Sequence, residues 1–271
     1  MKKIDITKIL LGSDPEFPLF RKSDNKFISA EGIIGGTKDS PQFISKDGHA
    51  IQEDGVMLEC TFPPANDPYT FKDNLDFVLN YIRDKHQSLD ISFNPAVEFD
   101  DEYLQTIQAT TVGCSADFDV WENTLADVPN YRKTNLRYAG GHLHVGYPNP
   151  DNDTSEELVK ALDVYLGVPS VLIDTDELRK KLYGSAGRFR PKPYGIEYRS
   201  MSNYWLKNLE TIRWVFGNTK EAILFLNNGF KIAAEDKKWI QECMKNNDKE
   251  LAESIIASYE IRVPETLLEP A

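Results

Sequence analysis

Strand-like and helical stretches follow one another along this chain without regular alternation, and this order restricts the fold more than any other feature. Period-two alternation of apolar and polar residues predicts strands within residues 8–62, 91–99, 135–147 and 194–202. Helical spacing predicts amphipathic helices over residues 69–87, 154–168 and 205–226, and residues 232–271 are typical of exposed helices. Because no strand–helix–strand unit repeats, the order favours an α+β fold with an antiparallel sheet.

The predicted helix at 154–168 has recognisable end signals. Thr154 and Glu157 stand in the register of a capping box, in which each side chain satisfies a free backbone N–H of the first turn. Gly167 is expected to close this helix, because glycine is favoured just beyond a helix C-terminus.

Composition argues against several classes of partner. The formal net charge is −12 and the pI is near 4.9, so we expect no nucleic-acid-binding surface and no attraction to an anionic membrane. Cys60, Cys114 and Cys243 form no CxxC pair and are expected to be reduced thiols. We expect no signal peptide and no membrane span, and therefore a cytoplasmic location.

Four of the strand-like stretches carry charged or imidazole side chains at even spacing, which places them on one face of a strand. These residues are Asp14 and Glu16; Glu59, with Glu53 in the same parity if that strand is continuous; His142 and His144; and Glu197 and Arg199. Taken one at a time, each pair is ordinary on a solvated strand face or as a surface ion pair. If the strands are neighbours, however, five or more carboxylates and imidazoles share one pocket.

Such a cluster needs cations, because like charges in a shared site repel one another and raise the pKa of their carboxyl groups. A site rich in carboxylate oxygens suits Mg²⁺ or Mn²⁺ better than zinc. The joint pattern therefore predicts more than one divalent cation.

A basic stretch follows the histidine pair and runs into the last of these motifs. Its cations are Arg179, Lys180, Lys181, Arg188, Arg190, Lys192 and Arg199. Alone it is typical of a solvated loop, but beside a metal site it favours phosphate binding, since arginine binds phosphoryl oxygens bidentately. The glycine-rich stretch GIIGGTKDS lacks the Gly-Lys-Ser/Thr end of a Walker A loop and is interpreted as a turn. No motif for nucleophilic catalysis is present.

The stretches GSDPEF, EDGVMLECTFPPA, GGHLHVGY and FRPKPYGIEYRSMSNYW follow one another between residues 12 and 205. In this order they resemble the glutamine synthetase and glutamate–cysteine ligase superfamily of carboxylate–amine ligases, and in particular the short phage-type amidoligases. The resemblance implies a curved, mainly antiparallel sheet like that of the glutamine synthetase catalytic domain, with helices on its convex side. The concave face would hold ATP and two or three Mg²⁺ ions.

The resemblance also implies roles for individual residues. The implied metal ligands are Asp14, Glu16, Glu59, His142 and Glu197, with Glu53 or Asp54 left open as a further ligand. The implied contacts to the nucleotide are His144, Arg188, Arg190, Lys192 and Arg199. Arg199, which would meet the transferred phosphate, and Glu59 are the implied catalytic residues.

The function that follows is an ATP-dependent ligase that joins a carboxylate to an amine through an acyl phosphate. The substrates would be small molecules or peptides; glutamate and ammonia are not expected, because the chain is much shorter than glutamine synthetase and opens with Asp14 rather than glutamate. Two alternatives stay open at this point: another metal-dependent phosphoryl-transfer or hydrolytic enzyme, and a non-catalytic acidic binding protein. A cupin-like metal site is disfavoured because no histidine follows His144.

We expect one catalytic domain over residues 1–271, with the motifs within 8–206 and a C-terminal helical segment over 207–271. The sequence leaves open a homo-oligomer in which neighbouring subunits complete the site, as they do in glutamine synthetase. The resemblance implies the host cytoplasm as location if the protein is phage-encoded.

Overall fold

The computed structural model describes residues 1–110, 117–126, 134–174, 178–182 and 184–268. Cys60 and Cys243 are buried free thiols, as predicted, whereas Cys114 lies outside the described residues. None of the helices in the described part of the chain combines the length and the apolar character needed to cross a bilayer.

The strands form four groups, and within the described residues every pairing is antiparallel. The largest sheet has the order β1 (Leu10–Ser13), β13 (Leu143–Gly146), β15 (Gly195–Tyr198), β14 (Arg188–Lys192), β10 (Phe118–Asp119) and β11 (Thr124–Leu125). A second sheet has the order β2 (Glu16–Phe17), β7 (Met57–Thr61), β6 (Ala50–Asp54) and β5 (Gln42–Phe43). The smaller groups are β4 (Phe27–Ile28), β3 (Leu19–Arg21) and β8 (Leu89–Ile91), and β12 (Leu136–Tyr138) with β9 (Ala96–Glu98).

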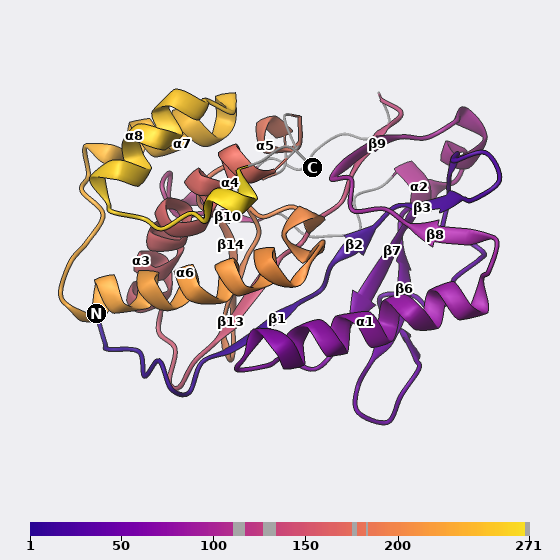
Figure 1. Cartoon of the computed structure of the whole chain (residues 1–271), viewed down its shortest axis with the longest axis horizontal. Helices are drawn as coiled ribbons and strands as arrows, with labels where there is room; N and C mark the ends of the chain where they lie inside the picture. The colour runs from indigo at the N-terminus through magenta and orange to yellow at the C-terminus, as the bar shows by residue number, and fades with distance from the viewer. Residues whose placement is uncertain (111–116, 127–133, 175–177, 183, 269–271) are drawn as a thin grey trace.

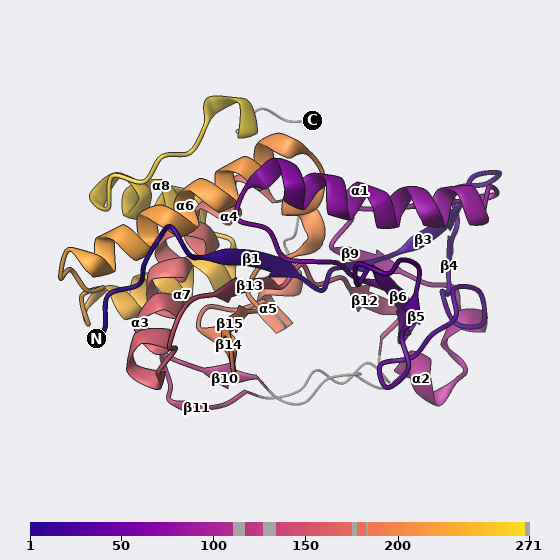
Figure 2. The same cartoon turned by 90° about the horizontal axis from the view of Figure 1, so that it is seen from below.

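The helices interrupt the strands irregularly, in agreement with the predicted α+β organisation. The α-helices are α1 (Pro68–Lys85), α2 (Ile107–Thr110), α3 (Asn152–Leu162), α4 (Val168–Ile173), α5 (Arg179–Leu182), α6 (Leu209–Asn227), α7 (Asp236–Asn246) and α8 (Lys249–Ser258). Short 3₁₀ turns cover Asp101–Leu104, Asn203–Leu206 and Glu265–Leu267. The long helices α1 and α6 pack against each other and run in front of the strands (Figure 1). In the perpendicular view α1 and α6 lie above β1, whereas β10 and β11 lie at the bottom, on the opposite side of β1 from these helices (Figure 2).

Alternation along the strands divides the largest sheet into an apolar and a polar face. Leu11, Val145 and Ile196 are fully buried in the core that also contains Leu158 of α3 and Ile212 of α6. Their strand neighbours point the other way, because successive side chains of a strand alternate between faces. The helices therefore cover one face, and the polar residues gather on the other.

The two larger sheets are joined through one length of chain. After β1 ends at Ser13, Asp14 and Pro15 turn the chain into β2, which pairs with β7 instead of β13. The backbone N–H of Cys60 donates to the carbonyl of Pro15 at 3.0 Å, which holds the turn against β7. This junction brings the polar groups of both sheets next to each other.

The predicted helix at 69–87 is confirmed as α1, but the end signals at 154–168 were wrongly interpreted. The N-cap of α3 is Asp151, whose carboxylate accepts from the N–H of Thr154 at 2.9 Å. Gly167 does not end the helix, because a π-helical turn over Asp163–Gly167 leads directly into α4. A Cβ on Gly167 would meet Met244 Sδ at 2.8 Å, so glycine is required there for close packing.

Asp163 in the π-helical turn ties the helices to the strands that carry the polar residues. Its fully buried carboxylate accepts from Trp121 Nε1 at 2.6 Å, from the N–H of Gly187 at 2.7 Å and from Tyr198 Oη at 2.7 Å. Burial raises the pKa of Asp163 to about 7, despite these three donors. Gly187 and Tyr198 lie at β14 and β15, so Asp163 holds both strands in place.

We expect Asp163→Ala to lower the free energy of unfolding by about 3 kcal/mol or more, because three buried donors lose their acceptor. Tyr198→Phe removes a single donor and should cost about 1 kcal/mol. Urea unfolding of both variants measures the difference. Equal losses in the two variants would contradict a shared anchoring role for this carboxylate.

Candidate active site

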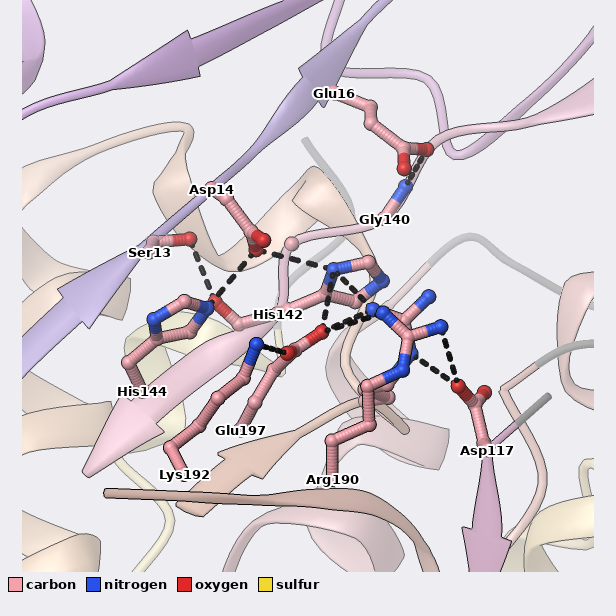
Figure 3. A network of polar contacts seen from close by, with 12 residues as sticks. Ser13, Asp14, Glu16, Asp117, Gly140, His142, His144, Arg190, Lys192 and Glu197 are labelled. Carbon is pink, nitrogen blue, oxygen red and sulfur yellow. Dashed lines mark hydrogen bonds and ion pairs between the residues drawn. The ribbon is translucent and has the colours of Figure 1, made fainter. Parts of the chain in front are cut away.

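The polar face of the largest sheet carries one cross-strand row of functional side chains. The register aligns Gly12 of β1 with His144 of β13, His144 with Glu197 of β15, and Glu197 with Arg190 of β14. These side chains point toward one another together with Asp14 and Lys192 (Figure 3). The even spacing in the sequence thus produced the predicted shared face.

Glu197 is the centre of this row. Its buried carboxylate lies 2.5 Å from Lys192 Nζ and 3.5 Å from Arg190 Nη1, and it also contacts the guanidinium of Arg199. Burial and the charge of Asp14 act to raise the pKa of Glu197, but His142, the charge of Arg199 and a hydrogen bond from Lys192 outweigh them, and the pKa falls to about 2. Glu197 is therefore a carboxylate at neutral pH, available as a ligand for a cation.

Asp14 lies between the two histidines at the end of β1. Its Oδ1 is 3.1 Å from His142 Nδ1 and 3.2 Å from His144 Nε2. Burial would raise its pKa, but the two imidazoles hold the pKa of Asp14 well below its usual value. Within the described residues, ligand atoms of Asp14, His144 and Glu197 all lie within 4.8 Å of one another, a group that can hold a metal ion.

The two histidines have different surroundings. His144 lies next to Tyr194, whose hydroxyl contacts Nδ1 at 2.8 Å, so that Nε2 faces Asp14. This arrangement is typical of metal-binding imidazoles, whose second nitrogen is fixed by another hydrogen bond. His142 precedes β13 and is buried, with its Nδ1 at 3.1 Å from both Asp14 and Arg199; burial and the Arg199 charge lower the pKa of His142. Both histidines therefore reach Asp14, and the role of His142 as a ligand stays a prediction.

A second group of carboxyl groups lies on the neighbouring sheet. The register aligns Glu16 of β2 with Glu59 of β7, and Glu59 with Gln52 of β6. Burial and the charge of Asp54 raise the pKa of Glu16 to about 8, and burial, Asp14 and Asp54 raise the pKa of Glu59 well above its usual value. Burial also raises the pKa of Asp54. These carboxyl groups favour their protonated forms because they are buried and lie near one another.

Glu53 does not belong to this group, so the expected shared parity with Glu59 is wrong. The hairpin between β6 and β7 reverses the chain, which aligns Glu53 with Leu58 instead. Glu53 Oε1 accepts from the N–H of Gly32 at 2.9 Å and of Gly35 at 2.8 Å. It thereby fixes the glycine-rich stretch as a set of turns, as interpreted from the sequence, and Asp54 is the acid of this pair that faces the other carboxyl groups.

The basic stretch is folded into α5, β14 and β15, and only part of it faces the site. Arg190, Lys192 and Arg199 contact Glu197. Arg188 donates from Nε to Ser185 Oγ at 2.8 Å and lies 3.9 Å from Asp119, to one side of the row. Its predicted contact with a nucleotide stays a prediction.

Two further basic residues of the stretch, Arg179 and Lys180, are buried and do not form an open phosphate-binding loop. Arg179 is buried and donates to the carbonyls of Arg199 at 3.1 Å and Ser200 at 2.9 Å. Lys180 is buried as well, and the side chain of Lys181 lies outside the described part of the structure. Arg179 thus supports the chain at the end of β15 through these hydrogen bonds.

Asp117 is a site residue that the sequence reasoning missed. It precedes β10 and forms ion pairs with Arg199 Nε at 2.7 Å and with Arg190 Nη2 at 3.1 Å. The signal was available, because Asp117 and Asp119 in the stretch DFDV have the same even spacing as the other acidic pairs.

A cavity of about 470 Å³ opens beside the row. Asp14, Glu59 and His144 line its polar side, and Leu10, Phe62, Pro64 and Tyr194 are among the residues of its remaining wall. Its volume lies within the range of small-molecule sites, and such sites combine apolar walls with a few fixed polar groups. The cavity therefore gives a small molecule access to the polar row.

A comparison with family models finds a match over part of the chain. Residues 132–233 match the family described as phage phiEco32-like COOH-NH2 ligase type 2. This segment contains both histidines, Glu197 and the site cations Arg190, Lys192 and Arg199. Asp14, Glu16 and Glu59 lie outside it. A search of curated proteins gives no match. Over residues 132–233, the resemblance to the phage-type amidoligases is thus confirmed as similarity to a COOH-NH2 ligase family.

Proposed function

We propose that this protein is an ATP- and Mg²⁺-dependent ligase that joins a carboxylate to an amine through an acyl phosphate. The observation that carries the proposal is the position of Glu197. It stands between a carboxylate–imidazole group, Asp14 and His144, and the cations Arg190, Lys192 and Arg199. A cation-binding half and an anion-binding half that meet at one residue suit a metal–triphosphate substrate.

The donor atoms fit Mg²⁺ or Mn²⁺. Asp14, Glu197 and an imidazole would hold one ion, and Glu16, Glu59 and Asp54 would hold a second. When bound, these ions would neutralise phosphate charge and orient the triphosphate. In metal-free protein the second group retains protons instead, which supports a cation at that position.

The reaction we propose has two steps. A substrate carboxylate oxygen attacks the γ-phosphorus of ATP, the bond to the β-phosphate oxygen breaks, and ADP leaves. The amine nitrogen then attacks the carbonyl carbon of the acyl phosphate, loses a proton and expels phosphate. Arg199 and Arg190 would stabilise the charge on the phosphoryl oxygens in transit, which needs no protein nucleophile.

The fold supports the same interpretation. We propose that the largest sheet and the sheet of β2 and β7 together correspond to the curved sheet of the glutamine synthetase catalytic domain. The polar row would then be on the concave face, with α3 and α6 behind the apolar face. Residues 1–271 would act as one catalytic domain, and a homo-oligomer is part of the proposal.

Hydroxylamine offers a test that does not require the natural amine. As a small nucleophile, it should convert an acyl phosphate into a hydroxamate, which ferric iron reveals by colour. Pools of amino acids, peptides and other carboxylates are incubated with the protein, ATP, Mg²⁺ and hydroxylamine. We expect one class of carboxylate to give hydroxamate and ADP in equal amounts, and neither product in EDTA.

ADP without hydroxamate in every pool would instead favour another metal-dependent phosphoryl-transfer or hydrolytic enzyme. Neither product, together with no binding of nucleotide, would favour the acidic binding protein.

A further inference from the structure

Asp117 holds two of the site arginines from the β10 side of the sheet. Phe118, the next residue, pairs with Phe189 of β14, and this pairing places Asp117 beside Arg190. The side chain of Asp117 is only 7% exposed, and its Oδ1 lies 2.7 Å from Arg199 Nε and 3.1 Å from Arg190 Nη2 (Figure 3 shows the Arg190 side of this contact). One buried oxygen therefore lies between two guanidinium groups.

The same two arginines also contact Glu197. Arg190 Nη1 is 3.5 Å from Glu197 Oε1, and Arg199 approaches the same oxygen. Each guanidinium thus lies between two carboxylates and uses different nitrogens for each. Since a guanidinium is planar and rigid, contacts at two of its edges fix its orientation.

We propose that Asp117 is a positioning residue that keeps Arg190 and Arg199 directed at the terminal phosphoryl group of the nucleotide. This inference rests on the proposed ligase function, because the phosphoryl group is that of the ATP we propose as substrate. Without Asp117, Glu197 draws both guanidinium groups toward itself and away from the phosphoryl group. Glu197 is then also less available as a metal ligand.

The inference predicts an effect that depends on the terminal phosphate. A residue that merely supports the fold would change the affinities for a triphosphate and a diphosphate alike. A residue that directs arginines at the terminal phosphoryl group affects the triphosphate more. The probes are AMP-PNP, a non-hydrolysable ATP analogue, and ADP, each titrated calorimetrically in excess Mg²⁺.

We expect Asp117→Asn to weaken AMP-PNP binding by about 10- to 100-fold, the range found when residues that orient a ligating group are replaced. ADP binding should change by less than about threefold, because ADP lacks the terminal phosphate at which these arginines are directed. Asp117→Glu keeps the charge and should restore part of the AMP-PNP affinity. Asp90→Asn removes the carboxylate of a remote Asp–Arg pair, Arg83 Nε–Asp90 Oδ1 at 2.9 Å, and should leave both affinities unchanged.

Retained ADP binding in Asp117→Asn demonstrates that the site is folded. Equal weakening of both nucleotides, or no weakening of either, overturns the positioning role while the proposed function stands. A wild-type protein that binds neither nucleotide overturns the proposed function, and this inference with it.

Discussion

Glu197→Gln should weaken the binding of divalent cations by about 100-fold or more, which corresponds to about 3 kcal/mol. The substitution removes one carboxylate of the group formed with Asp14 and His144. It also leaves Lys192, Arg190 and Arg199 beside a neutral amide, so that their positive charge repels a cation more strongly. Titration with Mn²⁺, with the free ion followed by electron paramagnetic resonance, measures the change.

The same variant should lose about 3 kcal/mol of stability, because breaking a buried ion pair leaves buried charges uncompensated. Glu98→Gln is the matched control, since Glu98 is an exposed glutamate on another strand, β9, and should bind Mn²⁺ like the wild type. Mn²⁺ affinity of Glu197→Gln within about threefold of the wild type, measured below its unfolding temperature, would show that Glu197 is not a metal ligand.

Glu59→Gln should make the metal-free protein more stable at pH 8 and reduce the stabilisation that Mg²⁺ provides, because only the ion held by Asp14, His144 and Glu197 would remain. Both effects would follow from the buried, neighbouring carboxyl groups of Glu16, Asp54 and Glu59. The pKa of Glu16 rises from 4.5 to about 8 on folding, and the pKa of Glu59 is also raised. Between pH 4.5 and about 8 the folded state holds a proton that the unfolded state has released, so the free energy of unfolding falls as the pH rises through this window.

The slope is at most about 1.4 kcal/mol per pH unit for one such group. Replacing Glu59 by a neutral amide removes one of the crowded charges, and we expect a gain of about 1 kcal/mol at pH 8 without metal. Mg²⁺ should stabilise the wild type more at pH 8 than at pH 5, because the ion replaces bound protons.

Thermal unfolding at both pH values, with Mg²⁺ and with EDTA, provides the measurement for wild type, Glu59→Gln and the control Glu98→Gln. A wild-type stability that rises between pH 5 and 8 without metal, or an undiminished effect of Mg²⁺ on Glu59→Gln, would contradict a cation site at these carboxyl groups.

Local pattern indicated which side chains of the site share a strand face, on the condition that the strands are neighbours. Side chains two residues apart on a strand share a face, and antiparallel neighbours align in register, so the spacing of His144 and Glu197 in their segments led to one row. The amphipathic helix α1 followed equally from its apolar spacing. The face of a single strand or helix depends on spacing over a few residues, which a sequence displays directly, whereas the pairing of β13 with β15 joins residues far apart in the sequence.

Long-range pairing and turns decided the rest. The expected parity of Glu53 with Glu59 failed because the hairpin after Asp54 reverses the chain. Asp117 joins the site only because β10 pairs with β14, two strands that are far apart in the sequence. Arg179 looked like part of a basic loop, but it is buried and binds backbone carbonyls, and a count of charges does not reveal burial.

The most direct test of the central claim is a calorimetric titration of the wild-type protein with AMP-PNP, once in Mg²⁺ and once in EDTA. Binding with Mg²⁺ that disappears in EDTA is the result we predict, because Glu197 joins the cation-binding and anion-binding halves of one site. No binding in Mg²⁺, or equal binding in EDTA, would contradict a metal-dependent nucleotide site on this face of the sheet.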